Sequence, residues 1–237
     1  MLTAYVITIE NHPASNKASD EVIKSWEKNS SIPIVKFKAT TPLDCNEHYD
    51  KYKLFWNPVG HHSTRNLPFD ALKSVKTSNL SKAACAMSHI RLWDMAQTED
   101  LIILEHDAEL IRKLTDNDID MIQRSPYGIV SLWYAGMNPK RTNFFYYPDR
   151  SDVNFPDLTN TITLSGGNTA YYVKSWAAKI VLERINEISY MPCANDTFLS
   201  DWFGFDFLAS PKENKGWTDI ERLSLNTSGD WLNHWST

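Results

Sequence analysis

Two carboxylates directly follow a short apolar run in this sequence of 237 residues. The run is Leu101 to Leu104, and Glu105, His106 and Asp107 come next. On an extended segment, residues two apart point the same way, so Glu105 and Asp107 would converge on one ligand while His106 faces elsewhere. Carboxylate oxygens suit magnesium or manganese, which can bridge a protein to a diphosphate. The alternative is a solvated strand end, because acidic side chains are mostly exposed.

The elements that position these carboxylates begin with a β-α-β pattern. Leu2 to Ile9 and Ile32 to Phe37 are predicted strands, because they are rich in β-branched and aromatic residues. Ser19 is predicted to cap the helix between them, with Asp20 and Glu21 in the first turn. This order implies a parallel sheet with a right-handed crossover.

The apolar run itself is predicted to be a strand covered on both faces. An amphipathic helix is expected just before it, from about Ser81 to Gln97. Ligands of open α/β sheets bind beyond the carboxyl ends of the strands. Glu105 and Asp107 would lie at such an end.

The remaining segments give weaker patterns. Residues 40–78 are expected to be irregular, and 137–160 to form a long loop. Further strands are predicted over 128–133, 161–164 and 169–173, and Ser175 is predicted to cap a helix. With no repeat and no linker, a single α/β domain over residues 1–237 is the simplest organisation.

Composition excludes several classes of protein. The net charge of −5 and the lack of a basic run argue against a duplex nucleic-acid partner. No window approaches the ~20 apolar residues of a membrane span, and no secretory leader is recognised at Met1. Cys45, Cys85 and Cys193 are odd in number and far apart, which favours reduced thiols. We therefore expect a cytoplasmic protein whose membrane contact, if any, is peripheral.

Several segments together resemble a known family. Ala84 to Trp93 followed by Leu101 to Asp107 resembles the "GCxLSHxxxW … hhxEDD" pattern of glycosyltransferase family 25. Bacterial lipopolysaccharide glycosyltransferases and collagen galactosyltransferases belong to that family. Gly167 to Val173 is similar to its "GxxAYhhS" strand, and Pro192 to Leu199 to its "PxDxxL" segment.

The resemblance implies a GT-A-like α/β fold, in which a Rossmann-related nucleotide-binding sheet is merged with an acceptor-binding half. It also implies a nucleotide-sugar donor, with a UDP-hexose expected, a glycan acceptor and usually manganese. Glu105 would then face the ribose of the nucleotide, and Asp107 would bind the metal. Two positions depart from the family pattern. His106 replaces its central Asp, and Ser81-Lys82 replaces its "GE".

Other candidate site residues lie later in the chain. Gly166 and Gly167 let the backbone approach a donor sugar or diphosphate, although a plain hairpin turn would also use them. Asp196 is the candidate general base for an acceptor hydroxyl, with Asp201 as its rival. Asp196 could instead be a helix N-cap.

Four histidines, at three places in the chain, also need an interpretation. His234 is a candidate third metal ligand, although it lies near the chain terminus. His89 shares a helix face with Cys85 and Trp93, which is more typical of a hydrogen-bonded structural histidine than of a ligand. His61-His62 is interpreted as a solvated pair.

The expected function is transfer of a hexose, galactose or glucose, from a nucleoside-diphosphate sugar to a glycan hydroxyl. Metal dependence and inversion are what the resemblance implies. One alternative is a catalytically inactive glycan- or nucleotide-binding protein of the same fold, which the substitutions at His106 and Lys82 make credible. Another is a metal-dependent phosphohydrolase, although such sites usually need more clustered ligands than this sequence displays.

Overall fold

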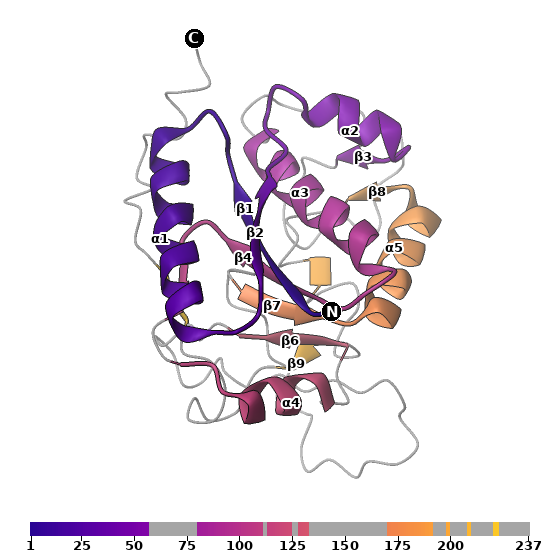
Figure 1. Cartoon of the computed structure of the whole chain (residues 1–237). Helices are drawn as coiled ribbons and strands as arrows, with labels where there is room; N and C mark the ends of the chain where they lie inside the picture. The colour runs from indigo at the N-terminus through magenta and orange to yellow at the C-terminus, as the bar shows by residue number, and fades with distance from the viewer. Residues whose placement is uncertain are drawn as a thin grey trace, which may run out of the picture.

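The computed structural model describes residues 1–56, 80–110, 113–124, 128–132, 170–191, 198–199, 208–209 and 220–222. A six-stranded sheet of order β2-β1-β4-β7-β6-β9 runs through these residues (Figure 1). Its strands are β1 (Thr3–Thr8), β2 (Ile34–Lys38), β4 (Leu101–Glu105), β6 (Ile129–Ser131), β7 (Ala170–Val173) and β9 (Leu208–Ala209).

The sheet is mixed. Strand β1 pairs in parallel with β2 and with β4, and β6 pairs in parallel with β9. Strand β7 is antiparallel to β4 and to β6. Two small sheets accompany it, a parallel pair of β3 (Phe55–Trp56) with β8 (Tyr190–Met191) and an antiparallel pair of β5 (Ala108–Leu110) with β10 (Ile220–Arg222). The α/β class expected from the sequence is confirmed.

Helices cover both faces of the sheet (Figure 1). Helix α1 lies on one side, and α3 and α5 lie on the other. Their bounds, with those of the two shorter helices, are α1 (Pro13–Asn29), α2 (Cys45–Lys51), α3 (Leu80–Ala96), α4 (Asp116–Arg124) and α5 (Ser175–Ile188).

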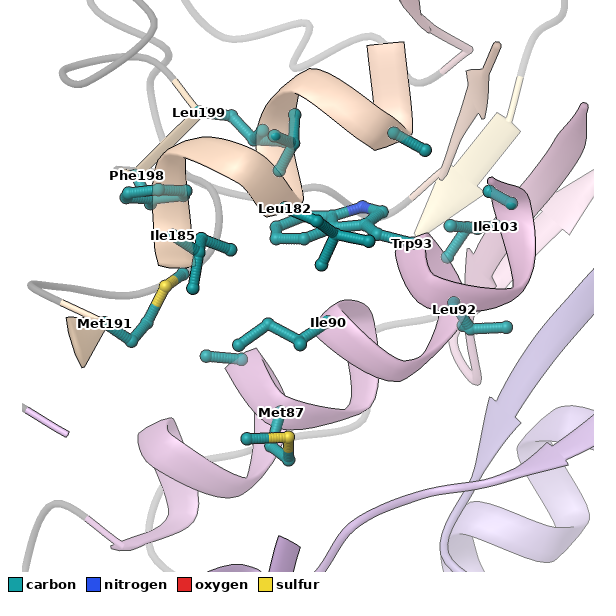
Figure 2. Packing of buried hydrophobic residues seen from close by; sticks show 14 of the residues in the cluster. Met87, Ile90, Leu92, Trp93, Ile103, Leu182, Ile185, Met191, Phe198 and Leu199 are labelled. Carbon is teal, nitrogen blue, oxygen red and sulfur yellow. The ribbon is translucent and has the colours of Figure 1, made fainter. Parts of the chain in front are cut away.

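Strand β4 divides the core into two apolar layers. Leu101 and Ile103 pack in the layer formed with α3 and α5, part of which Figure 2 shows. Ile102 and Leu104 pack in the other layer, with side chains from α1. All four side chains are fully buried, so the strand is covered on both faces as predicted.

The start of α1 differs from the prediction at Ser19. The helix begins at Pro13, and His12 is its N-cap, with the imidazole Nδ1 accepting the Ser15 N–H at 3.1 Å. Proline suits the first helical position because it lacks the N–H that would be unsatisfied there. Ser19 lies inside the helix, buried, and its hydroxyl donates to the Ser15 carbonyl at 2.8 Å.

Two further predictions about helices and strands were wrong. Part of the segment expected to be irregular forms α2 and β3, within the described residues up to Trp56. The N-cap of α5 is Lys174 and not Ser175. Ser175 instead donates its backbone N–H to Asp100 Oδ1 at 2.8 Å, so a carboxylate that comes just before β4 satisfies the helix start.

Two of the three cysteines lie within the described residues. Cys45 and Cys85 form no disulfide, and burial raises the pKa of the Cys45 thiol to about 12. Cys193 lies outside the described residues. None of the described helices is both long enough and apolar enough to cross a membrane.

Candidate functional site

Three parallel strands end side by side. Ile7 of β1 pairs with Phe37 of β2 on one side and with Glu105 of β4 on the other. The carboxyl ends of these strands are therefore level, and Glu105 lies at the edge of the sheet where α/β proteins bind ligands.

The two predicted carboxylates differ in their surroundings. Glu105 is the last residue of β4, and its side chain is 21% exposed. His106 and Asp107 form a turn before β5, and Asp107 is buried at 3% exposure. The chain is therefore extended only as far as Glu105. Because Asp107 follows in a turn, strand alternation no longer predicts that its side chain lies on the same side as that of Glu105.

A buried polar chain reaches Glu105 from α3 and β7. The Trp93 indole N–H donates to the Tyr171 hydroxyl oxygen at 2.9 Å, and that oxygen is 2.7 Å from His89 Nδ1. His89 Nε2 lies 3.9 Å from Glu105 Oε1. The expectation that His89 is a hydrogen-bonded histidine is confirmed, and its ring is fully buried.

This arrangement follows from strand register. Tyr171 pairs with Ile103, and directly opposed residues share a face of the sheet. Glu105 is two residues from Ile103, so it shares that face as well. His89 and Trp93 are four residues apart on α3, which places both over the same strands. The four-residue spacing of His89 and Trp93 can be read from the sequence. Their contact with Tyr171 cannot, because Tyr171 lies 82 residues after His89 and is brought close by the pairing of β7 with β4.

Three possible metal ligands also meet here. The ligand atoms of Cys85, His89 and Glu105 lie within 4.8 Å of one another, and Asp107 is not in this group. A thiolate, an imidazole and a carboxylate together suit zinc. Magnesium and manganese prefer oxygen ligands, so this trio does not match the expected cofactor.

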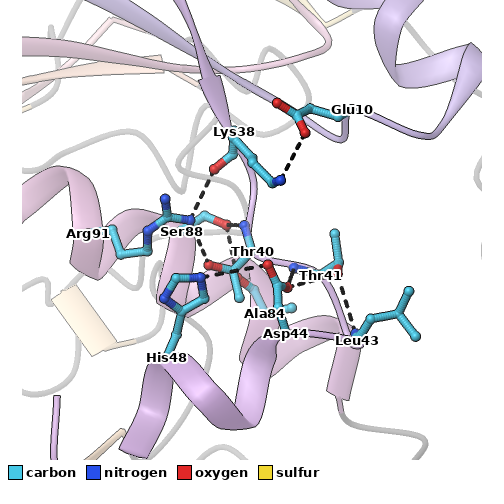
Figure 3. A network of polar contacts seen from close by, with 10 residues as sticks. All are labelled: Glu10, Lys38, Thr40, Thr41, Leu43, Asp44, His48, Ala84, Ser88 and Arg91. Carbon is cyan, nitrogen blue, oxygen red and sulfur yellow. Dashed lines mark hydrogen bonds and ion pairs between the residues drawn. The ribbon is translucent and has the colours of Figure 1, made fainter. Parts of the chain in front are cut away.

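A second polar network lies at the end of β2 (Figure 3). The guanidinium of Arg91 donates to the Lys38 carbonyl at 3.0 Å and to the Thr40 hydroxyl at 3.1 Å. Ser88 accepts the Thr40 backbone N–H at 2.9 Å, and Lys38 pairs with Glu10 at 2.9 Å. Ser88 and Arg91 therefore hydrogen-bond helix α3 to the carboxyl end of β2. The same helix approaches Glu105 through His89.

Most of the later candidates cannot be placed beside this edge. They lie outside the described residues, as does the loop expected over residues 137–160. These candidates are Gly166, Gly167, Asp196, Asp201, His234 and the pair His61-His62. Strand β7 does begin here, since Ala170 pairs with Leu104.

A family model identifies the chain. The model of glycosyltransferase family 25, described as an LPS biosynthesis protein, matches residues 1–199. This chain belongs to that family, and it is a glycosyltransferase. The family expected from the sequence motifs is thereby confirmed. No curated protein matches the chain.

Two solved structures are similar in outline. Mouse xyloside xylosyltransferase 1 in its apo form is 8% identical, with a TM-score of 0.44, over 89% of this chain and 85% of that one. A197 from STIV is 12% identical, with a TM-score of 0.36, over 88% of this chain and 81% of that one.

Proposed function

We propose that this glycosyltransferase moves a hexose, galactose or glucose, from a nucleoside-diphosphate sugar to a glycan hydroxyl in lipopolysaccharide biosynthesis. The donor is a UDP-hexose and the reaction inverts the anomeric carbon. The enzyme acts as one domain over residues 1–237, in the cytoplasm. The observation that supports the proposal most is the position of Glu105, which ends β4 at the carboxyl edge of three parallel strands in a family 25 sheet.

Glu105 would accept hydrogen bonds from the ribose hydroxyls of the donor. Its partial exposure leaves the carboxylate accessible to a ligand. The Glu105 carboxylate loses water when a ligand binds, so it then needs a hydrogen-bond donor on the ligand. Because an ionised carboxylate can only accept hydrogen bonds, this position favours the hydroxyls of a sugar over a bare phosphate.

Asp107 and His234 would hold a manganese or magnesium ion. Asp107 comes two residues after the end of β4, and its carboxylate offers the hard oxygen that these ions prefer, so this residue fits the group. When bound, the ion would neutralise charge that develops on the departing nucleotide. The family pattern supports the assignment of Asp107, whereas that of His234 rests on its late position in the chain, beyond the residues 1–199 that the family model matches.

The remaining roles concern the sugar and its acceptor. Gly166 and Gly167 come shortly before β7, which begins beside the end of β4, and would let backbone approach the diphosphate. Asp196 would accept the proton of the acceptor hydroxyl as the new bond to the sugar forms. Asp201 is the rival for this role.

A thermal-shift screen of nucleotide sugars with and without manganese tests donor binding. A donor at about 100 times its dissociation constant stabilises by about 2.7 kcal/mol, which raises Tm by roughly 5–10 °C for a protein of this size. We expect that shift for one UDP-hexose, and only with the metal present. Asp107→Asn should remove the effect of manganese. Full donor affinity in a chelator would contradict the metal assignment.

Transfer is tested by a matched pair of substitutions. Asp196→Asn keeps the size of the side chain and removes its basicity, so turnover should fall by roughly 10²-fold or more while donor affinity stays within a few-fold. Asp201→Asn is the control and should retain turnover. If the unmodified protein binds donor but neither transfers nor hydrolyses it over a broad acceptor panel, it is an inactive binding protein.

A further inference from the structure

Three buried polar side chains form a line through an otherwise apolar layer and end at Glu105. Trp93, whose indole lies among apolar side chains of α3 and α5 in Figure 2, is fully buried, as is His89, and Tyr171 is 2% exposed. Buried polar groups are costly unless each one is hydrogen-bonded, so the order of donors and acceptors along this line is constrained.

The positions of the protons follow from the donors available. An indole N–H can only donate, so the Tyr171 oxygen accepts from Trp93. Tyr171 then has one hydroxyl proton, and in the described part of the chain the other contact of its oxygen is His89 Nδ1. If the hydroxyl donates to Nδ1, the Trp93 N–H, the Tyr171 hydroxyl and Nδ1 are all hydrogen-bonded, and the imidazole proton lies on Nε2, on the side of Glu105. The opposite order would bury the hydroxyl proton without an acceptor.

Two further features support this order. Burial raises the pKa of Tyr171 well above its usual range, with Glu105 and Cys85 adding to the effect and the Trp93 hydrogen bond opposing it, so the hydroxyl keeps its proton. The rings of His89 and Tyr171 are stacked, with centroids 5.7 Å apart and planes 18° apart. The imidazole therefore has a fixed plane as well as a fixed tautomer.

We propose that His89 is a positioning residue for donor binding, whose Nε2–H is directed at the Glu105 carboxylate and holds it in the orientation that accepts the ribose hydroxyls. The proposal rests on the proposed function, in which Glu105 binds the ribose. The separation of 3.9 Å between Nε2 and Oε1 exceeds hydrogen-bond length. Contacts of this kind often tighten only when the ligand is bound.

The same tautomer disfavours a zinc ion held by Cys85, His89 and Glu105. Metal binding needs a lone pair on Nε2, so the imidazole proton would have to move to Nδ1. The Tyr171 hydroxyl proton would then lose its acceptor inside the apolar layer. The polar chain therefore favours a histidine that donates to Glu105 over one that binds a metal.

The tautomer can be measured directly. Nitrogen-15 NMR of the full chain with labelled histidine distinguishes a protonated Nε2 from a protonated Nδ1, and His89→Gln assigns the signal among the seven histidines. We expect the Nε2–H form in the unmodified protein and loss of that preference in Tyr171→Phe. An Nδ1–H form in the unmodified protein overturns the proposal.

Tyr49→Phe is the matched control. Its hydroxyl is also buried, and donates to the Ala83 carbonyl at 3.2 Å without touching His89. The tautomer signal should be unchanged in this variant. A change as large as that in Tyr171→Phe would mean that the signal reports general loosening of the core, and would overturn the assignment.

Donor affinity tests what the tautomer does. His89→Leu removes the N–H and should weaken UDP-hexose binding by about tenfold in calorimetry, with a matching rise in the donor KM and little change in kcat. His89→Gln supplies an amide N–H and should recover part of the loss. If His89→Leu does not fold, by circular dichroism, the comparison of His89→Gln with the unmodified protein decides.

A double-mutant cycle separates this proposal from the proposed function. If His89 acts through Glu105, the pair His89→Leu with Glu105→Gln should bind donor no more weakly than Glu105→Gln alone. Additive losses would overturn the positioning role while leaving Glu105 as a donor contact. Unchanged affinity in Glu105→Gln would instead overturn the ribose contact assigned to Glu105, whatever the tautomer of His89.

Discussion

Strand β4 has a carboxylate at each end, and the two are held in different ways. Asp100, just before the strand, accepts the Ser175 N–H at 2.8 Å through Oδ1, and accepts the Tyr172 hydroxyl through Oδ2. Glu105, at the other end, is partly exposed and faces His89 Nε2. Asp100 thus joins β4 to β7 and to the start of α5, whereas Glu105 is partly exposed at the carboxyl edge of the parallel strands.

The neighbouring tyrosines of β7 show the same contrast. Tyr171 and Tyr172 point to opposite faces of the sheet because they are adjacent on a strand. The hydroxyl of Tyr172 is directed to Asp100, and that of Tyr171 belongs to the chain that reaches Glu105. Two side chains of one type, both at most 2% exposed, therefore serve opposite ends of β4. Burial alone does not separate a structural tyrosine from one that supports a site.

The comparison predicts that the two ends separate function from stability. Glu105→Gln should weaken UDP-hexose binding by about tenfold or more, because a neutral amide replaces an ionised acceptor. Its Tm without donor should stay within about 2 °C of the unmodified protein, because the side chain is partly exposed. Calorimetry measures the donor affinity, and thermal unfolding measures the Tm. A variant that loses stability but binds donor normally would reverse the assignment.

Asp100→Asn should show the converse. Loss of charge on a carboxylate that accepts two hydrogen bonds should cost about 2 kcal/mol of unfolding free energy, or roughly 4–8 °C in Tm. Donor affinity should be unchanged once the fraction of folded protein is taken into account. Denaturant titration with and without donor measures both. A tenfold loss of donor affinity in this variant would show that the ends of β4 are not independent.

His106→Asp adds a charge at the Glu105 end only. The side chain lies in the turn after β4, and the change restores the family residue. The fold should be retained, and manganese affinity should stay equal or rise, because another carboxylate oxygen becomes available near Asp107. The manganese affinity is measured by titrating manganese in the presence of donor and recording the Tm. Loss of activity with an intact fold would mean that His106 contacts substrate directly.

The sequence predicted those parts of the fold whose pattern is strong over many residues. Helix α3 and strand β4 were predicted within a residue or two, because an apolar repeat and a buried run leave few alternatives. Helix α2 was missed, since its seven residues bury only Cys45 and Tyr49, too few to display a period. The start of α1 was missed because a histidine, an uncommon cap, satisfies it.

The site was predicted less completely. The position of Glu105 at the end of β4 followed from chain order alone. The convergence of Glu105 and Asp107 assumed an extended chain, and the turn at 106–107 removes that basis. The chain from Trp93 to Glu105 requires the register of β7 against β4, which a single sequence does not specify.

The smallest expected effect concerns His48, a partly exposed histidine on α2. His48 Nε2 lies 3.6 Å from Asp44 Oδ2, yet burial and the nearby charge of Arg91 outweigh this partner and lower the pKa of His48 below its ordinary 6.5. The folded protein therefore takes up this proton less readily than the unfolded chain does. The resulting stability is present above pH 6.5 and is lost as the pH falls through the folded pKa.

His48→Gln, which cannot titrate, should remove this acid sensitivity. Between pH 7 and pH 5, the unmodified protein should lose slightly more Tm than the variant, by at most about 2 °C, because solvent screens a partly exposed group. Donor affinity at pH 7 should be equal in the two proteins, in contrast to the loss expected on replacing the buried His89. Thermal unfolding at both pH values is the measurement. Equal losses of Tm would mean that acid acts elsewhere, and weaker donor binding in His48→Gln would extend the site along α2.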